Sequence, residues 1–130
     1  MKLMSKKILV VDDDESIVEV IQLLLESEGY QVESSLNGDC IPDFPGGTPD
    51  LILLDVLLSG KDGREICKRL KSDPETAHIP VIMLSAHVDA SRLMHDSGAD
   101  DFIEKPFDID DFIAVVAKHA PRYTSNAEIQ

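Results

Sequence analysis

The chain has 130 residues, of which 43% are hydrophobic and 28% charged, a balance typical of a single soluble domain with a sizeable core. Its formal net charge of −13 argues against direct nucleic-acid binding, because an acidic surface repels phosphate backbones. No apolar run approaches the roughly 18 residues of a membrane-spanning helix, and the N-terminal "MKLMSKK" lacks the apolar core of a signal peptide. With only two cysteines, which we expect to be free thiols, the composition predicts a cytoplasmic protein.

Short apolar runs predict the strands of a parallel sheet. In chain order, the segments with a strand pattern are 7–11, 30–34, 51–54, 81–84 and 101–104. The first, third and fourth are almost entirely apolar, as expected for strands that are covered on both faces. The second and fifth, "YQVES" and "DFIE", are weaker candidates.

Helical patterns alternate with these strands. The first helix is predicted to end at Gly29. Its apolar face is predicted to consist of Ile17, Val20, Ile21, Leu24 and Leu25. The next helix begins with a capping-box pattern formed by Asp62 and Glu65, and a short helix is expected around Leu93 and Met94.

The last helix has the clearest signal. Its apolar face is predicted to consist of Ile109, Phe112, Ile113, Val116, Ala117 and Ala120. Acidic residues lie at its positive N-terminal end, while Lys118 and His119 lie at its negative C-terminal end. Pro121 follows, which marks the end of the helix.

The connection between the second and third strands has a different composition. Its sequence "CIPDFPGGTP" carries three prolines and two glycines, which leave room for at most one helical turn. We therefore predict an irregular cover over residues 40–49, in which Ile41 and Phe44 still plug the face of the sheet.

The alternation of strands and helices predicts one α/β domain with a parallel sheet and right-handed crossovers. We expect this domain to span residues 6–120. A short extension over 1–5 precedes it, and a polar tail over 121–130 follows it and frays.

Polar residues follow the predicted strands at the points where they end. Asp12 and Asp13 follow the first strand, Asp55 the third, Ser85 the fourth and Lys105 the fifth. In open α/β sheets ligands bind beyond the carboxyl ends of the strands, so we expect these groups to converge. Clustered carboxylates repel one another unless a hard divalent cation lies among them, and Mg²⁺ prefers such oxygen ligands. The pattern therefore predicts a Mg²⁺ site that also accepts a phosphoryl group.

These motifs resemble the receiver domain of bacterial two-component response regulators, the CheY-like family. The matching features are the acidic pair after "ILVV", "LILLD" before a "DG", "VIMLSA" and "GADDFIEKPF", and they cover about residues 6 to 120. The resemblance implies a flavodoxin-like (βα)5 three-layer sandwich. Its parallel five-stranded sheet would have the order 2-1-3-4-5, with the second helix degraded in this chain.

The resemblance implies that Asp55 is the phosphoacceptor. It would take a phosphoryl group from the phosphohistidine of a sensor histidine kinase or phosphotransfer protein and become a 4-aspartylphosphate. The implied cofactor is Mg²⁺, bound by Asp55, directly by Asp13, through water by Asp12, and by the backbone carbonyl of Leu57. The resemblance thus implies a phosphorelay module that is not itself an enzyme.

Three further residues receive roles from the resemblance. Lys105, with an expected cis bond to Pro106, would contact the phosphoryl group. Ser85 would be the switch hydroxyl, and Phe102 is equally expected to be an aromatic switch or plain core. The output face would be formed by the fourth helix, the fifth strand and the fifth helix.

Two alternatives stay open. A Mg²⁺-dependent phosphatase of the haloacid dehalogenase type also uses an aspartate after a buried strand, but it needs a second aspartate where Leu57 stands. A receiver used only for docking, independently of phosphorylation, is the other alternative. The sequence names neither the kinase nor the output partner. It leaves open a monomer or weak homodimer, and a stand-alone protein or part of a larger one.

Overall fold

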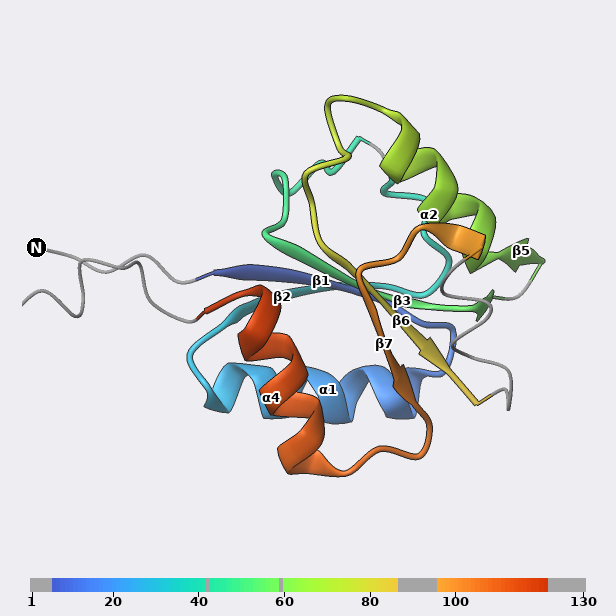
Figure 1. The fold of residues 1–130 in the computed structure, drawn as a ribbon. Coiled ribbons are helices and arrows are strands. Elements are labelled where there is room, and N and C mark those ends of the chain that lie inside the picture. Colours follow the sequence, from blue (N-terminus) through green and yellow to red (C-terminus); the bar gives the residue numbers. More distant parts are fainter. Residues whose placement is uncertain (1–5, 42, 59, 87–95, 122–130) are drawn as a thin grey trace, which may run out of the picture.

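A five-stranded parallel sheet forms the centre of the molecule in a computed structural model, which describes residues 6–41, 43–58, 60–86 and 96–121. Its strands are β1 (Lys7–Val11), β2 (Gln31–Ser35), β3 (Leu51–Asp55), β6 (Val81–Ser85) and β7 (Asp101–Glu104). They are parallel and lie in the order β2-β1-β3-β6-β7 (Figure 1), which confirms the predicted order of the five strands.

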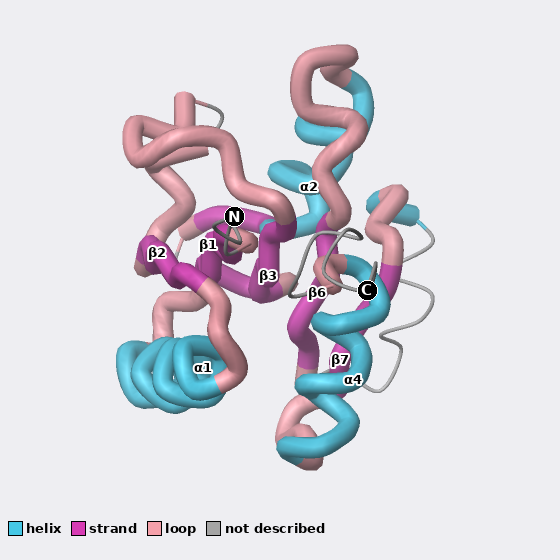
Figure 2. The backbone as a smooth tube through the Cα atoms, turned by 90° about the vertical axis from the view of Figure 1, so that its left-hand side faces the viewer, coloured by secondary structure: helices cyan, strands magenta, loops and turns pink. Residues whose placement is uncertain are grey.

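Helices cover both faces of the sheet. Figures 1 and 2 show α1 (Glu15–Ser27) and α4 (Ile109–His119) on one side and α2 (Gly63–Ser72) on the other. Buried side chains form one core cluster under α1 and α4 and a second one under α2. The strands lie between the two clusters, which explains why β3 and β6 are buried at every residue.

The buried stripe of α1 differs in part from the predicted one. The helix buries Val18, Ile21 and Leu25, whereas Val20 is 49% exposed. In α4, Phe112 and Val116 are buried, but Ile109 is 52% exposed. Ile109 is the first residue of α4, and burial begins only one turn later. The period of the helices was therefore predicted correctly, but the predicted faces included the exposed Val20 and Ile109 and missed the buried Val18.

Side-chain caps fix where the helices begin. Asp14 is the N-cap of α1 and accepts hydrogen bonds from the backbone N–H groups of Ser16 and Ile17. Asp62 caps α2 by accepting from the N–H of Arg64. The two caps therefore fix the first turns of α1, which follows β1, and of α2, which follows β3 and the short hairpin after it.

The connection between β2 and β3 contains no helix among its described residues, as the prolines predicted. Phe44 is 8% exposed and Ile41 is half-buried, and both pack against the core cluster under α2. Lys7 ties this connection to the sheet, because its ammonium contacts the Gly46 carbonyl and its backbone N–H donates to Asp50. The segment is an irregular cover held at its far end.

A small hairpin was not predicted from the sequence. Directly after β3, the strands β4 (Leu57–Leu58) and β5 (Lys61–Asp62) pair in an antiparallel way. Two-residue strands are too short to give a periodic pattern, so sequence reasoning could not find them.

Some expectations lie outside the described residues, namely the short helix around Leu93 and Met94, the extension over 1–5 and most of the tail over 121–130. Residues 96–97 are helical and Gly98, with a φ of +80°, follows them. Among the described helices, none has the length and apolar character needed to cross a membrane.

Candidate functional site

Three carboxylates meet at the carboxyl edge of the sheet. Asp12 follows β1 directly, Asp55 is the last residue of β3, and Asp13 comes next to Asp12. One carboxylate oxygen of each residue lies within 4.8 Å of the others. Asp12 is fully buried and Asp55 is 8% exposed, whereas Asp13 is exposed. The structure therefore brings together the three acids that the sequence predicted, two of them inside the protein and one at its surface.

Lys105 supplies the positive charge of the site. Its Nζ atom lies 2.7 Å from Oδ2 of Asp12 and 3.5 Å from Oδ1 of Asp55. The lysine follows β7, and its backbone N–H donates to the carbonyl of Ser85 at the end of β6. The Lys105–Pro106 peptide bond is cis, as expected. Lys105 is thus aimed at the acids from the neighbouring side of the sheet.

Asp12 is satisfied on both of its oxygens. Oδ2 accepts from Lys105, and Oδ1 accepts from the backbone N–H of Asp14 at 3.0 Å. A buried carboxylate is tolerated only when it is paired and hydrogen-bonded in this way. The turn that starts α1 therefore also orients Asp12.

The surroundings of Asp55 change its acidity. Burial, and next the nearby Asp12 carboxylate, raise the pKa of Asp55 from 3.8 to about 6, although the Lys105 ammonium and the N–H of Leu57 act in the opposite direction. At neutral pH the side chain is therefore mainly ionised, while its negative charge is poorly compensated. Such a carboxylate gains from any cation that compensates its charge.

A cavity of about 330 Å³ opens beside Asp55. Its lining includes Leu57, Ser85 and Lys105, and Ser85 is only 1% exposed. The cavity therefore offers a carboxylate, a hydroxyl and an ammonium to one small polar group. The Leu57 side chain is 54% exposed, so it forms part of the outer rim.

The donor set of the site fits Mg²⁺. All three acids offer carboxylate oxygens, and the exposed position of Asp13 leaves room for the waters that Mg²⁺ keeps. The three acids would hold the ion, and Lys105 is already paired with Asp12. A role of the Leu57 carbonyl as a further ligand stays a prediction.

Gly63 is a site residue whose role the sequence did not show. A Cβ atom on Gly63 would lie 2.0 Å from the carbonyl oxygen of Asp55, and the N–H of Gly63 donates to the carbonyl of Val56 at 2.7 Å. The start of α2 therefore packs directly against the backbone of Asp55, and no side chain fits between them. The "DG" pair was the available signal, but only the fold reveals this close approach.

Phe102 does not line the cavity. It lies within β7, where it pairs in register with Met83, and its half-buried side chain packs against the core cluster under α2. The structure thus places Ser85 at the cavity and Phe102 on the adjacent strand. Phe102 lies two residues before Glu104, which is the register partner of Ser85. His78 and His119 lie away from the acids, and His119 contacts Asp101 instead.

Comparisons with known proteins agree with this arrangement. The family model described as "Response regulator receiver domain" matches residues 8–117. The chain is 39% identical over 118 residues to the DNA-binding dual master transcriptional regulator RpaA of Synechocystis sp., covering 85% of this chain and 47% of that protein. It is 41% identical over 108 residues to the response regulator PleD of Caulobacter vibrioides, covering 81% of this chain and 24% of that protein. The chain therefore spans about half or less of the length of these relatives.

Solved structures share the fold. A putative response regulator from Chloroflexus aurantiacus superposes with a TM-score of 0.84 at 31% identity, covering 92% of this chain and 100% of that one. The signal receiver domain of a signal transduction histidine kinase from Syntrophus aciditrophicus gives a TM-score of 0.82 at 34% identity, covering 93% and 96% of the two chains.

Proposed function

Because the chain belongs to the response regulator receiver domain family, we propose that Asp55 is the residue that accepts the phosphoryl group. The observation that carries the proposal is the convergence of Asp12, Asp13 and Lys105 around Asp55 beside a small cavity. The donor would be the phosphohistidine of a sensor histidine kinase or a phosphotransfer protein.

The transfer replaces one bond to phosphorus by another. An Asp55 oxygen forms a P–O bond while the P–N bond of the phosphohistidine breaks, and the electron pair stays on the imidazole nitrogen. Bound Mg²⁺ would offset the charge that gathers on the phosphoryl oxygens and the carboxylates. The 3.5 Å distance between Nζ of Lys105 and Oδ1 of Asp55 supports a role of this lysine in binding a phosphoryl oxygen.

The switch would use Ser85 and Phe102. The Ser85 hydroxyl lines the cavity, so it can hydrogen-bond a phosphoryl oxygen on Asp55. If Ser85 moves toward the phosphoryl group, the end of β6 moves with it and the packing of Phe102 on β7 changes. Burial of a phenylalanine ring contributes roughly 1.5–3 kcal/mol, which is enough to favour one of two conformations. The output surface would then be the face that contains the helix before β7, β7 itself and α4. The first of these elements was expected around Leu93 and Met94, which lie outside the described residues.

The partners of the whole protein belong to the same proposal. We propose that the protein signals in the cytoplasm and that an output partner binds its switched face. The chain itself would be a monomer or a weak homodimer. RpaA and PleD extend far beyond the region that they share with this chain, so an output domain joined to the receiver fits the proposal as well.

The alternative functions receive less support. A haloacid dehalogenase-type phosphatase needs a proton-transferring acid two residues after the nucleophile, and Leu57 cannot transfer protons. A docking module without phosphorylation would have no use for Lys105 and three acids at one buried edge.

Incubation with a small acyl phosphate separates these hypotheses. With Mg²⁺, the proposal expects one phosphoryl group per chain, which survives mild acid and is lost in base, as an acyl phosphate should be. Continuous release of phosphate with fast turnover would favour the phosphatase, while the absence of any label at millimolar Mg²⁺ would favour the docking module.

A further inference from the structure

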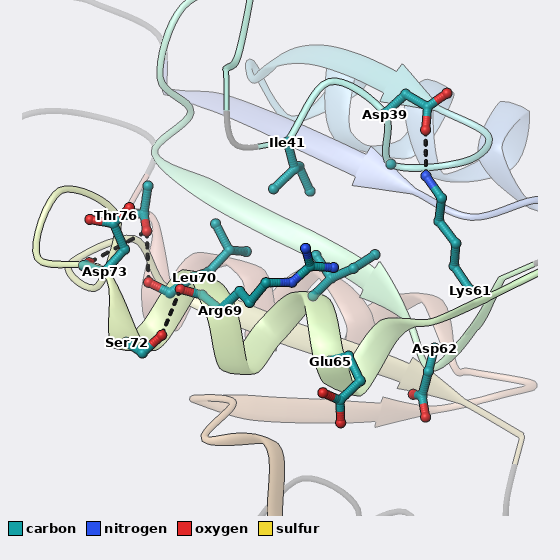
Figure 3. Close-up of a pocket in the computed structure, with 12 residues that line it drawn as sticks. Asp39, Ile41, Lys61, Asp62, Glu65, Arg69, Leu70, Ser72, Asp73 and Thr76 are labelled. Carbon is teal, nitrogen blue, oxygen red and sulfur yellow. Dashed lines mark hydrogen bonds and ion pairs between the residues drawn. The ribbon is translucent and has the colours of Figure 1, made fainter.

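A groove runs along α2 on the face of the molecule opposite to α1 and α4 (Figure 3). It encloses about 710 Å³, and its walls are α2 on one side and the stretch from Gly38 to Ile41 on the other. It is separate from the cavity beside Asp55, with which it shares no lining residue. The groove is therefore a different place on the molecule from the proposed phosphorylation site.

The groove exists because the connection between β2 and β3 has no helix among its described residues. The residues of α2 that line it recur at helical spacing, with Glu65 and Ile66 one turn before Arg69 and Leu70. This stripe is the face that a neighbouring crossover helix normally covers in a parallel sheet. At about 1.5 Å per residue, the ten residues of α2 give a stripe of roughly 15 Å, the length of a short helix.

The floor of the groove is apolar. Ile66 and Leu70 lie at its base, where they belong to the core cluster under α2 and are 6% and 2% exposed. The half-buried Ile41 closes the opposite wall (Figure 3). An aliphatic floor of this kind fits the side chains that an amphipathic helix presents on one face.

The charges around the groove are nearly all paired. Asp39 contacts Lys61, Asp62 lies 2.7 Å from Arg64, and Glu65 lies 3.4 Å from Lys68. The remaining acid, Asp73, accepts a hydrogen bond from a backbone N–H. Three acids on the rim are thus paired with cations of the chain, and the fourth is hydrogen-bonded.

Arg69 is the exception. Its guanidinium has no hydrogen-bond or ion-pair partner among the described residues, and Figure 3 shows it extending from α2 toward Ile41, over the groove. A guanidinium above an apolar floor matches a carboxylate placed beside aliphatic side chains.

We propose that this groove binds an amphipathic α-helix of a partner protein, which takes the place of the missing crossover helix. The partner helix would present aliphatic residues at i, i+3, i+4 and i+7 to the floor, and one Asp or Glu at the edge of that stripe to Arg69. The partner is therefore a helical protein segment with an acidic edge.

The probe for this proposal is a set of synthetic helical peptides of about 15 residues. Each has leucines at i, i+3, i+4 and i+7 and a single glutamate at one of the edge positions, and a matched set carries lysine instead. In titrations of the 15N-labelled 130-residue chain, at least one glutamate peptide should bind with a Kd below about 1 mM. The shifted amide signals should include residues 38–41 and 61–73 on both walls.

Charge reversal tests the role of Arg69. In Arg69→Glu, the glutamate peptide should bind about five- to tenfold more weakly, and the lysine peptide should gain affinity. Lys118→Glu, on α4 across the sheet, changes the net charge equally and should leave both affinities within about twofold. Both residues are exposed, so neither variant should unfold the chain.

Four outcomes would overturn the proposal. These are no binding by any peptide, shifts confined to another surface such as the exposed Val20 and Leu23 of α1, or equal effects of the two variants. The fourth is a shift of the groove signals with protein concentration alone, because the occupant would then be a second copy of the chain.

Discussion

Lys105 lies closer to Asp12 than to Asp55, at 2.7 Å against 3.5 Å. In the absence of a metal ion, the lysine is therefore first of all the counter-ion of a fully buried carboxylate. A side chain proposed to bind the phosphoryl group thus also stabilises the fold.

Lys105→Met should destabilise the metal-free protein, because Asp12 would keep its buried charge without a partner. Breaking a buried ion pair from one side typically costs about 3–5 kcal/mol, so the midpoint of urea unfolding should fall markedly. Lys118→Met removes an exposed lysine and should change the free energy of unfolding by less than about 0.5 kcal/mol. Similar effects of the two substitutions would show that the Lys105–Asp12 pair carries little stability.

Mg²⁺ should stabilise the fold through the acidic cluster. At a concentration of about 100 Kd, one bound ion adds roughly 2.7 kcal/mol to the free energy of unfolding. Asp13→Asn should remove most of this gain, because it deletes the exposed ligand without disturbing Asp12 or Asp55. The matched control is Asp14→Asn, which removes the adjacent charge while the Asn side chain still caps α1. Thermal melts with and without Mg²⁺ compare the variants, and an equal gain in Asp13→Asn and wild type would rule out this site.

The raised pKa of Asp55 predicts a pH dependence of stability. Between pH 3.8 and about 6, the folded chain binds more protons at Asp55 than the unfolded chain does, so this group lowers the free energy of unfolding as the pH rises. Asp55→Asn removes that penalty. In metal-free buffer it should be more stable than wild type by roughly 2–3 kcal/mol at pH 7, and the difference should vanish below about pH 4. Chemical unfolding across this range measures it, and a difference that does not change with pH would refute burial of the Asp55 charge as the cause.

Gly63→Ala should be strongly destabilising, because its Cβ atom would lie 2.0 Å from the carbonyl oxygen of Asp55. Backbone atoms cannot yield as a flexible side chain does, so a cost of about 3 kcal/mol or more is expected. Gly46→Ala is the matched control, since its Cβ atom meets only the movable end of the Glu33 side chain. A loss of stability no greater for Gly63→Ala than for Gly46→Ala would contradict the close packing of α2 on β3.

Much of the architecture could be predicted because burial on both faces makes a strand's sequence almost entirely apolar. β3 and β6 are recognisable for this reason, and the residues after them could be assigned to one edge of the sheet. The prolines of the β2–β3 connection likewise predicted the absence of a helix. The positions of Val20 and Ile109 could not be predicted, because the edge of a helix's buried face depends on its rotation over the sheet.

The geometry within the site depended on tertiary contacts that no local pattern contains. The sequence predicted that Lys105 and Asp12 would share an edge, but not that Lys105 would be nearer to Asp12 than to Asp55. The contact of Gly63 with the backbone of Asp55 joins α2 to β3 and was equally hidden. The orientation of Arg69 over the groove could not be predicted either, because the groove itself forms only in the folded chain.

Phosphorylation of Asp55 alone is tested most directly by intact-mass measurement after incubation with a small acyl phosphate and Mg²⁺. Wild type is expected to gain the mass of one phosphoryl group. Asp55→Asn should gain none while it stays folded by circular dichroism, and Asp13→Asn should gain it much more slowly. Labelling of Asp55→Asn to the same extent as wild type would contradict the assignment of Asp55 as the phosphoacceptor.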